Sequence, residues 1–144
     1  MYEHVLVPTD GSPTVETTLD HAIPIARDND ATVHGLYVVD NRIVTAADSD
    51  TRSDLESSLR EEGKTAVETV TDRAESAGLE AVGELRKGTP WKEILTYTEE
   101  ADADLIVIGT RGKSPREKIV SLGSVSERVV DNASTPVFVV RGGE

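Results

Sequence analysis

Short runs of large aliphatic residues recur along this chain, and segments with helical periodicity separate them. Near-continuous apolar runs of this length are typical of strands that are buried on both faces of a sheet. Parallel strands need a crossover between them, usually a helix, so the alternation predicts a doubly wound α/β fold. We expect a five-stranded parallel sheet with helices on both faces, its strands lying at 5–7, 31–39, 79–86, 104–108 and 137–140.

Capping residues and apolar spacing predict the helices between these strands. Ser53 and Glu56 have the spacing of a capping box, which indicates the start of a long helix that ends at Gly78. Residues 41–52 are polar and acidic, and we expect them to form a mobile loop. Two other helices are expected to begin with a capping residue followed by a first-turn proline, at Ser12-Pro13 and Thr89-Pro90.

The length and the absence of cysteine exclude several protein classes. A chain of 144 residues has the size of one domain, and we expect a single domain over residues 1–144. Without cysteine there are no disulfides, thiolate metal sites or cysteine nucleophiles. No apolar run approaches the roughly 20 residues of a membrane span, and no signal peptide opens the chain. We therefore expect a cytoplasmic protein with no membrane partner.

The charge balance is strongly acidic. Asp and Glu number 27 against 15 Lys and Arg, which gives a net charge of −12 and a pI near 4.6. Such a surface repels nucleic acid and anionic lipid, because affinity for both depends largely on Lys and Arg. The periodic apolar runs argue against disorder. We expect a folded, acidic protein with a halophilic surface and no nucleic-acid partner.

The segment 109–124 reverses this charge locally. Gly109 and Gly112 allow the backbone to approach a ligand closely, and Gly123-Ser124 opens a helix whose free N–H groups favour an anion. This pattern predicts a cradle for phosphates. The alternative is an exposed loop whose charges are solvated and in which Ser124 only caps the helix. Four of the 15 cationic residues fall within eight positions of the segment, at Arg111, Lys113, Arg116 and Lys118.

Two better-known phosphate motifs and a metal site are excluded. Gly112-Lys113-Ser114 resembles the end of a P-loop, but Val107 stands where that motif requires its first glycine. No G-x-G-x-x-G follows the first strand, which argues against ordinary dinucleotide binding. The three histidines, which lie on different elements at no ligand spacing, predict no metal site: His4, His21 and His34.

Several motifs stand in a fixed order along the chain: Pro8-Thr9-Asp10-Gly11-Ser12, Val38-Val39-Asp40, Ile106 to Gly112, Gly123 to Val129, and Thr135 to Val140. Over nearly its whole length the chain thereby resembles the universal stress protein family. The resemblance implies a Rossmann-like fold of the adenine nucleotide alpha hydrolase-like type. The nucleotide-binding branch of that family carries G-x2-G-x9-G followed by Ser or Thr, and its members bind ATP as dimers. Gly109, Gly112 and Gly123-Ser124 follow this order, with ten residues instead of nine in the second interval.

The resemblance implies a role for particular residues. Asp10 would lie near the ribose, with Pro8 and Thr9 shaping the floor of the site. A carboxylate suits ribose hydroxyls, although an aspartate here also suits the following Gly11-Ser12 turn. Val39 would offer a main-chain contact to adenine. The residues implied around the phosphates are Gly109, Arg111, Gly112, Gly123, Ser124 and Val125.

Two functions remain open. The first is an ATP-binding stress-response module, with ATP alone or with Mg²⁺, which acts through conformation or an unknown protein partner. The alternative is a dimeric interaction scaffold of the same fold that binds no nucleotide. No general base is identifiable near the glycine-containing segment 109–124. We therefore assign no catalytic residue and expect any ATP hydrolysis to be slow. The resemblance also implies a homodimer, which would cover an apolar edge strand formed by Val137, Phe138, Val139 and Val140.

Overall fold

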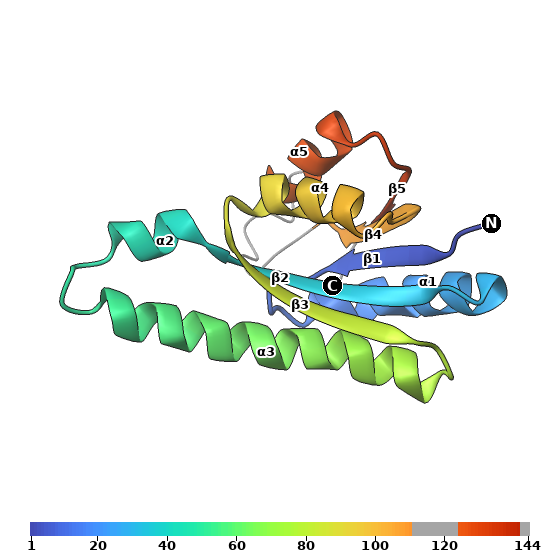
Figure 1. Ribbon diagram of the computed structural model, residues 1–144, viewed down its shortest axis with the longest axis horizontal. Helices are drawn as coiled ribbons and strands as arrows, with labels where there is room; N and C mark the ends of the chain where they lie inside the picture. The colour runs from blue at the N-terminus through green and yellow to red at the C-terminus, as the bar shows by residue number, and fades with distance from the viewer. Residues whose placement is uncertain (111–123, 142–144) are drawn as a thin grey trace.

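The computed structural model describes residues 1–110 and 124–141. It contains one sheet of five parallel strands in the order β3-β2-β1-β4-β5, which confirms the predicted α/β fold (Figure 1). Arg111, Gly112 and Gly123, three of the residues predicted around the phosphates, lie outside the described residues. The elements are β1 (His4–Pro8), α1 (Thr14–Asn29), β2 (Thr32–Asp40), α2 (Asn41–Ala46), α3 (Arg52–Ser76), β3 (Ala81–Gly88), α4 (Pro90–Glu100), β4 (Leu105–Gly109), α5 (Ser124–Asn132) and β5 (Val137–Val140).

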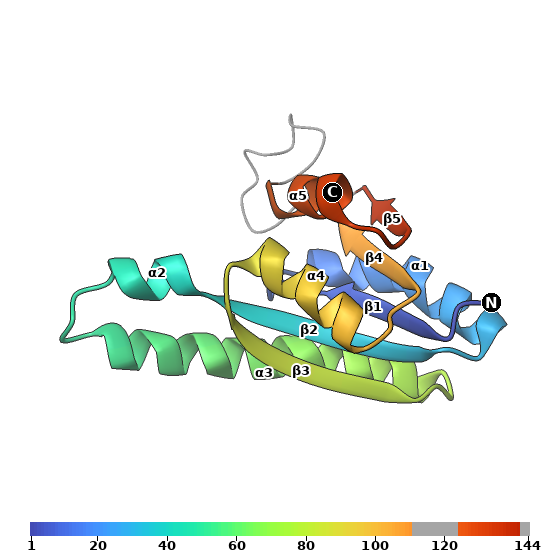
Figure 2. The same ribbon diagram turned by 45° about the horizontal axis from the view of Figure 1, so that its top comes forward.

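Helices cover both faces of the sheet, with α1 and α3 on one face and α4 and α5 on the other (Figures 1 and 2). Successive residues of a strand point to opposite faces, so each inner strand supplies both cores. Val5 and Val7 pack against α1 and α3, whereas Leu6 packs against α4 and α5. Burial on both faces accounts for the continuous apolar runs in the sequence.

The segment after β2 differs from the prediction. Residues 41–46 form the short helix α2 instead of a loop, because the Asp40 side chain accepts a hydrogen bond from the backbone N–H of Arg42 and so caps the helix. The predicted capping box is also wrong. Helix α3 begins at Arg52 with Thr51 as its N-cap, so Ser53 lies inside the first turn. By contrast, α4 begins as predicted, with Thr89 as N-cap and Pro90 as its first residue.

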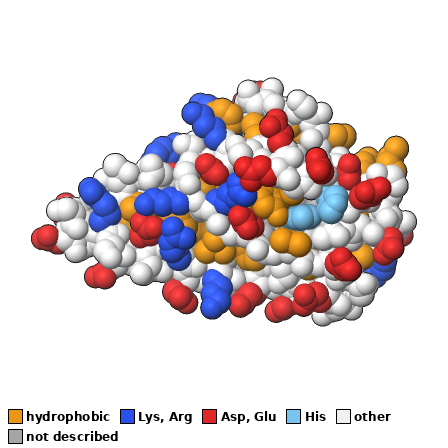
Figure 3. Space-filling view, viewed as in Figure 1, with side chains coloured by type: hydrophobic (Ala, Val, Ile, Leu, Met, Phe, Trp, Pro, Cys, Tyr) orange, Lys and Arg blue, Asp and Glu red, His pale blue; other side chains and the backbone are white. Residues whose placement is uncertain are grey.

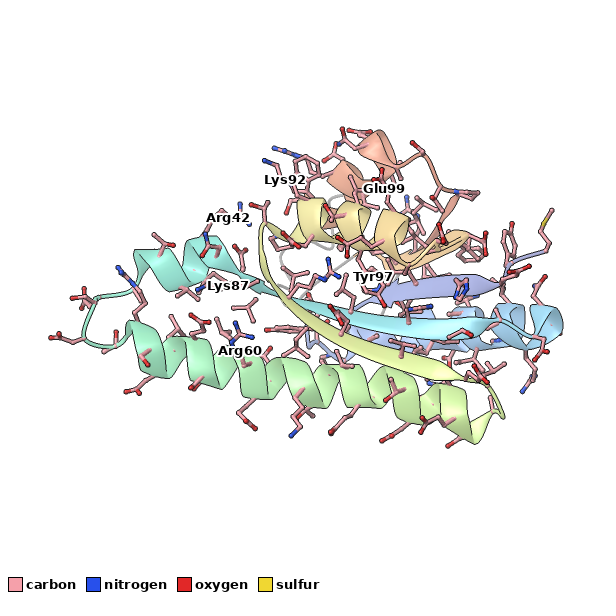
Figure 4. The ribbon with its side chains drawn as sticks, in the orientation of Figure 1. Arg42, Arg60, Lys87, Lys92, Tyr97 and Glu99 are labelled. Carbon is pink, nitrogen blue, oxygen red and sulfur yellow. The ribbon has the colours of Figure 1, made fainter. Side chains whose placement is uncertain are left out.

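Ion pairs connect the elements across an acidic surface. Acidic side chains are spread over the face in Figure 3, with cationic ones among them. Lys87 on β3 and Arg60 on α3 lie side by side in Figure 4, and both bond to Glu56, Lys87 at 2.8 Å and Arg60 at 3.0 Å. Exposed pairs of this kind contribute little to stability. Within the described part of the chain, no helix has the length and apolar character to cross a membrane.

Candidate functional site

A cleft of about 400 Å³ opens at the carboxyl ends of the strands. Ligands of open parallel sheets bind at this edge, and ligand pockets commonly measure about 300–1,000 Å³. The ends of β1, β2 and β4 form its floor, and residues of the surrounding helices form its walls. Of the residues that the structure describes, twenty line it: Pro8, Thr9, Asp10, Thr14, Val15, Thr18, Leu36, Tyr37, Val38, Asp40, Ile43, Leu59, Pro90, Ile94, Ile108, Gly109, Thr110, Ser124, Val125 and Ser126.

The cleft brings together most of the described residues that the sequence analysis selected. They come from three distant parts of the chain: Pro8 ends β1 and is followed by Thr9 and Asp10, Gly109 ends β4, and Ser124 and Val125 begin α5. Val39 is not among the lining residues, because its side chain is fully buried in a small core with Tyr37 and Val44, and the main-chain contact implied for it stays a prediction. Its neighbours Val38 and Asp40 line the cleft instead.

The turn after β1 is fixed by two side-chain hydrogen bonds. The Asp10 carboxylate accepts the Ser12 N–H at 2.9 Å, and the Thr9 hydroxyl accepts the Gly11 N–H at 3.1 Å. Gly11 has a φ of +86°, a left-handed conformation that favours glycine. These bonds hold the Asp10 side chain at the rim of the cleft. A carboxylate has more acceptor sites than this turn uses, so the turn is compatible with a ligand contact.

The first turn of α5 is tied to the end of β4. The Ser126 hydroxyl, which is only 4% exposed, donates to the Gly109 carbonyl at 2.7 Å. This bond holds Ser124 and Val125 against the cleft. The first N–H groups of a helix have no acceptor within it, and the helix dipole favours negative charge there. The α5 end of the cleft is therefore suited to an anion.

The opposite end of the cleft is lined largely by apolar side chains of β2, α2 and α3, with the Asp40 carboxylate among them. Burial raises the pKa of Tyr37 to about 12, and the charges of Glu62 and Asp10 act in the same direction. Tyr37 is thus a neutral phenol at physiological pH. The hydrogen bond from the Arg42 side chain lowers the pKa of Asp40, outweighing the effect of burial, so Asp40 is held as a carboxylate.

A buried polar cluster lies outside the cleft and was missed by the sequence analysis. The Nδ1 atom of His4 lies 3.0 Å from Nε2 of His34, and Nδ1 of His34 lies 2.7 Å from the Tyr97 hydroxyl. Tyr97 extends from α4 toward the sheet in Figure 4, and histidine side chains meet at one point of the face in Figure 3. Nevertheless, the part of the chain that the structure describes contains no group of three His, Cys, Asp or Glu residues placed to hold a metal ion.

The comparisons with known proteins all indicate the same family. The model of the universal stress protein family matches residues 1–141. The universal stress protein MJ0531 of Methanocaldococcus jannaschii is 42% identical over 142 residues, which cover 98% of this chain and 83% of that protein. The solved structure of MJ0577 from the same organism matches with a TM-score of 0.90 at 31% identity, and the match covers 100% of this chain and 99% of that one.

Two more distant solved structures contain nucleotides. One is a universal stress protein in complex with cAMP, with a TM-score of 0.71 at 23% identity, covering 99% of this chain and 98% of that one. The other is a family member from Arabidopsis thaliana with AMP bound. It has a TM-score of 0.73 at 19% identity, and the match covers 98% of this chain and 92% of that one. At these identities the similarity shows a shared fold.

Proposed function

Because this chain belongs to the universal stress protein family, we propose that it binds an adenine nucleotide in the cleft at the carboxyl ends of β1, β2 and β4. ATP, alone or with Mg²⁺, is the ligand we propose first. In this proposal the protein is a regulatory module whose conformation or choice of partner depends on the nucleotide that is bound.

One observation carries the proposal: a single cleft joins a helix N-terminus to an apolar chamber. Phosphates would lie against Ser124 and Val125, where free N–H groups and the dipole of α5 favour negative charge. The base would lie at the other end, among side chains of β2 and α2. The cAMP and AMP found in related folds support an adenine nucleotide as the class of ligand.

Asp10 would contact the ribose between these two ends. Its carboxylate lies at the cleft rim and is oriented by the Ser12 N–H. The two ribose hydroxyls are donors, and a carboxylate is the acceptor that dinucleotide-binding folds use for them. A sugar contact of this kind orients the base and the phosphates toward their respective ends of the cleft.

The cleft offers little for hydrolysis. No histidine or lysine is among the described residues that line it. The carboxylates among these described residues are Asp10, which is engaged in the turn, and Asp40, whose pKa is lowered by Arg42. A general base works best with a pKa near the operating pH, so the lowered pKa of Asp40 makes this carboxylate poorly suited to activate water. We therefore propose nucleotide binding with at most slow turnover.

Thermal unfolding with a panel of ligands tests this function. ATP, ADP, AMP, cAMP and GTP are each added to the protein in high potassium chloride. A ligand at 100 times its Kd stabilises the folded state by about 2.7 kcal/mol, so the midpoint temperature should rise with adenine nucleotides. Asp10→Ala should weaken ATP binding by about tenfold or more, as expected for a hydrogen bond to a charged group. Asp28→Ala, at an exposed position of α1, is the matched control.

The second candidate is a dimeric interaction scaffold that binds no nucleotide. The observation in its favour is β5, which pairs with β4 alone among the described strands and leaves Phe138 39% exposed. An apolar edge strand is a surface on which another chain can pair. If the folded protein showed no stabilisation by any nucleotide of the panel, this second function would replace the first.

A further inference from the structure

The one tryptophan of the chain is held between two cations from neighbouring helices. Trp91 lies in the first turn of α4, and its partly exposed ring packs against the core under α4 and α5. The Lys92 ammonium lies 5.6 Å from the centre of this ring, and the Arg128 guanidinium of α5 lies 5.4 Å from it. Attraction to the ring holds both cations in place. Trp91 thus carries a fixed pair of positive charges at the surface.

Neither of these cations is neutralised by a carboxylate of the described residues. Lys92 and Arg128 form no ion pair there, although acidic residues outnumber cationic ones by 27 to 15 in the whole sequence. The acid beside Lys92 is Glu93, whose carboxylate lies against Gly88 instead. Lys92 also occupies the first turn of α4, where the helix dipole favours an anion. Unpaired positive charge at such a place on an acidic protein points to a partner of opposite charge.

Further cations extend this positive surface around the carboxyl end of β3. Figure 4 shows Arg42 and Lys87 there together with Lys92, so that α2, β3 and α4 each contribute one cation. The Arg42 side chain is 72% exposed. Lys87 and Arg60 share the single carboxylate of Glu56, which leaves one positive charge in excess. Cationic side chains accordingly gather on the left of the face in Figure 3.

We propose that Trp91, Lys92 and Arg128 form the centre of a docking surface for an acidic segment of a partner protein, and that Arg42 and Lys87 extend it. Carboxylates of the segment pair with the cations, and an aliphatic side chain of the segment packs on the exposed part of the indole. Salt weakens the first kind of contact by screening. It does not weaken the second, because burial of apolar surface does not depend on charge.

The charge of the whole molecule selects a short acidic segment over other polyanions. The net charge of −12 means that nucleic acid or an anionic membrane, which extends beyond the surface, meets repulsion around it. The surface is also separate from the cleft, because none of Trp91, Lys92 and Arg128 is among the described residues that line the cleft. The inference therefore does not depend on nucleotide binding.

Titration of the full chain with a nine-residue peptide, four glutamates on each side of one leucine, tests the inference in 0.1 M potassium chloride. Trp91 is the only tryptophan, so a change in tryptophan emission reports binding at this surface. Lys92→Glu and Arg128→Glu should each bind the peptide at least about fivefold more weakly, since each replaces an attraction by a repulsion. Arg27→Glu is the matched control, because it makes the same charge change in the last turn of α1, beside the amino end of β2.

Three outcomes overturn the inference. The first is a wild-type protein that does not bind the peptide saturably. The second is an equal loss in Arg27→Glu, because the effect would then come from net charge and not from this surface. The third is binding of a nine-nucleotide oligothymidylate, or of phosphatidylglycerol vesicles, as tight as that of the peptide. Lys92→Glu places an anion where the dipole of α4 favours one, so this variant should keep the unfolding temperature of the wild type.

Discussion

At the scale of single residues, Gly63 explains how α3 can lie so close to the sheet. A Cβ atom added at this buried position would lie 2.4 Å from Cδ1 of Tyr37, well inside van der Waals contact. This role is not visible in the sequence, where a glycine within a helix indicates only a weaker helix by propensity. The close approach matters for the site, since Tyr37 lines the cleft.

Gly63→Ala should therefore destabilise the protein although alanine is the better helix former. The gain in helix propensity is about 1 kcal/mol, and overpacking against a buried ring costs about 1–3 kcal/mol. We expect a net loss of about 1 kcal/mol in the free energy of unfolding, measured with urea. Lys64→Ala, on the exposed side of the same turn, should change it by less than about 0.5 kcal/mol. A stabilised Gly63→Ala variant would show that the ring moves aside freely.

The residues of the cleft differ in how far the sequence alone could predict them. Pro8 to Asp10 and Gly109 follow apolar strands directly, and the edge of a parallel sheet at which ligands bind is known in advance. Ile43 and Leu59 could not be found in this way. Their contribution depends on how a helix outside the sheet is rotated, and that rotation is set by the burial of Val44 in a tertiary contact.

At the scale of secondary-structure elements, α4 is attached to the sheet through the polar cluster of His4, His34 and Tyr97. His34 is 6% exposed, and its pKa is lowered by burial first and by the charge of His4 second. Burial raises the pKa of Tyr97. Arg86 lies over the Tyr97 ring at 5.0 Å. The acidic groups near the cluster are Glu84 and Glu100, which affect Tyr97, and Asp104, which accepts the backbone N–H of His4.

This cluster predicts a loss of stability in mild acid. A histidine whose pKa is lower in the folded state favours unfolding as the pH falls below its unfolded value near 6.5, and the loss stops below the folded pKa. We expect the unfolding temperature to fall between pH 7 and pH 5.

The contribution of His34 is isolated by a pair of variants. In His34→Gln, the unfolding temperature should fall less between pH 7 and pH 5 than it does in the wild type, because the titrating ring is gone. His21→Gln removes a histidine outside the cluster, beside Phe138. In this variant the unfolding temperature should fall as much as in the wild type. Equal pH dependence in all three proteins would contradict this account of the cluster.

The main elements were predictable because each inner strand is buried on both faces and each crossover helix has an apolar side. The cluster and α2 were not predictable, for reasons of geometry. His4 and His34 meet only because β1 and β2 pair in the register that sets Leu6 beside His34. Helix α2 forms because Asp40 and Arg52 bond to its ends, and composition alone indicated a loop.

At the scale of the whole molecule, β5 predicts the mode of assembly. This strand pairs with β4 alone among the described strands, and Phe138 is 39% exposed. In a two-fold dimer through β5, Phe138→Glu would bring two carboxylates close together and should give a monomer by light scattering. Val82→Glu, on the opposite edge strand, should leave the dimer intact. A wild-type monomer, or dissociation by Val82→Glu alone, would contradict assembly through β5.

The net charge of −12 predicts that salt stabilises the fold. Screening weakens the repulsion among excess carboxylates, and the exposed ion pairs that it also weakens contribute little. The unfolding temperature should rise from 0.1 M to about 2 M potassium chloride, by about 4 °C for each kcal/mol gained. The rise should be smaller near pH 4.6, where the net charge approaches zero. A temperature that falls with salt at pH 7 would contradict a salt-adapted surface.

The central claim is that an adenine nucleotide binds with its phosphates at the first turn of α5, and calorimetric titration with ATP tests it most directly. Ser124→Glu places a negative charge at this helix end, where it suits the helix but repels a phosphate. Ser53→Glu makes the same change in the first turn of α3, away from the cleft. We predict saturable ATP binding by the wild type and Ser53→Glu, and at least about tenfold weaker binding by Ser124→Glu. Equal affinity in all three proteins, or no binding by the folded wild type, would contradict the claim.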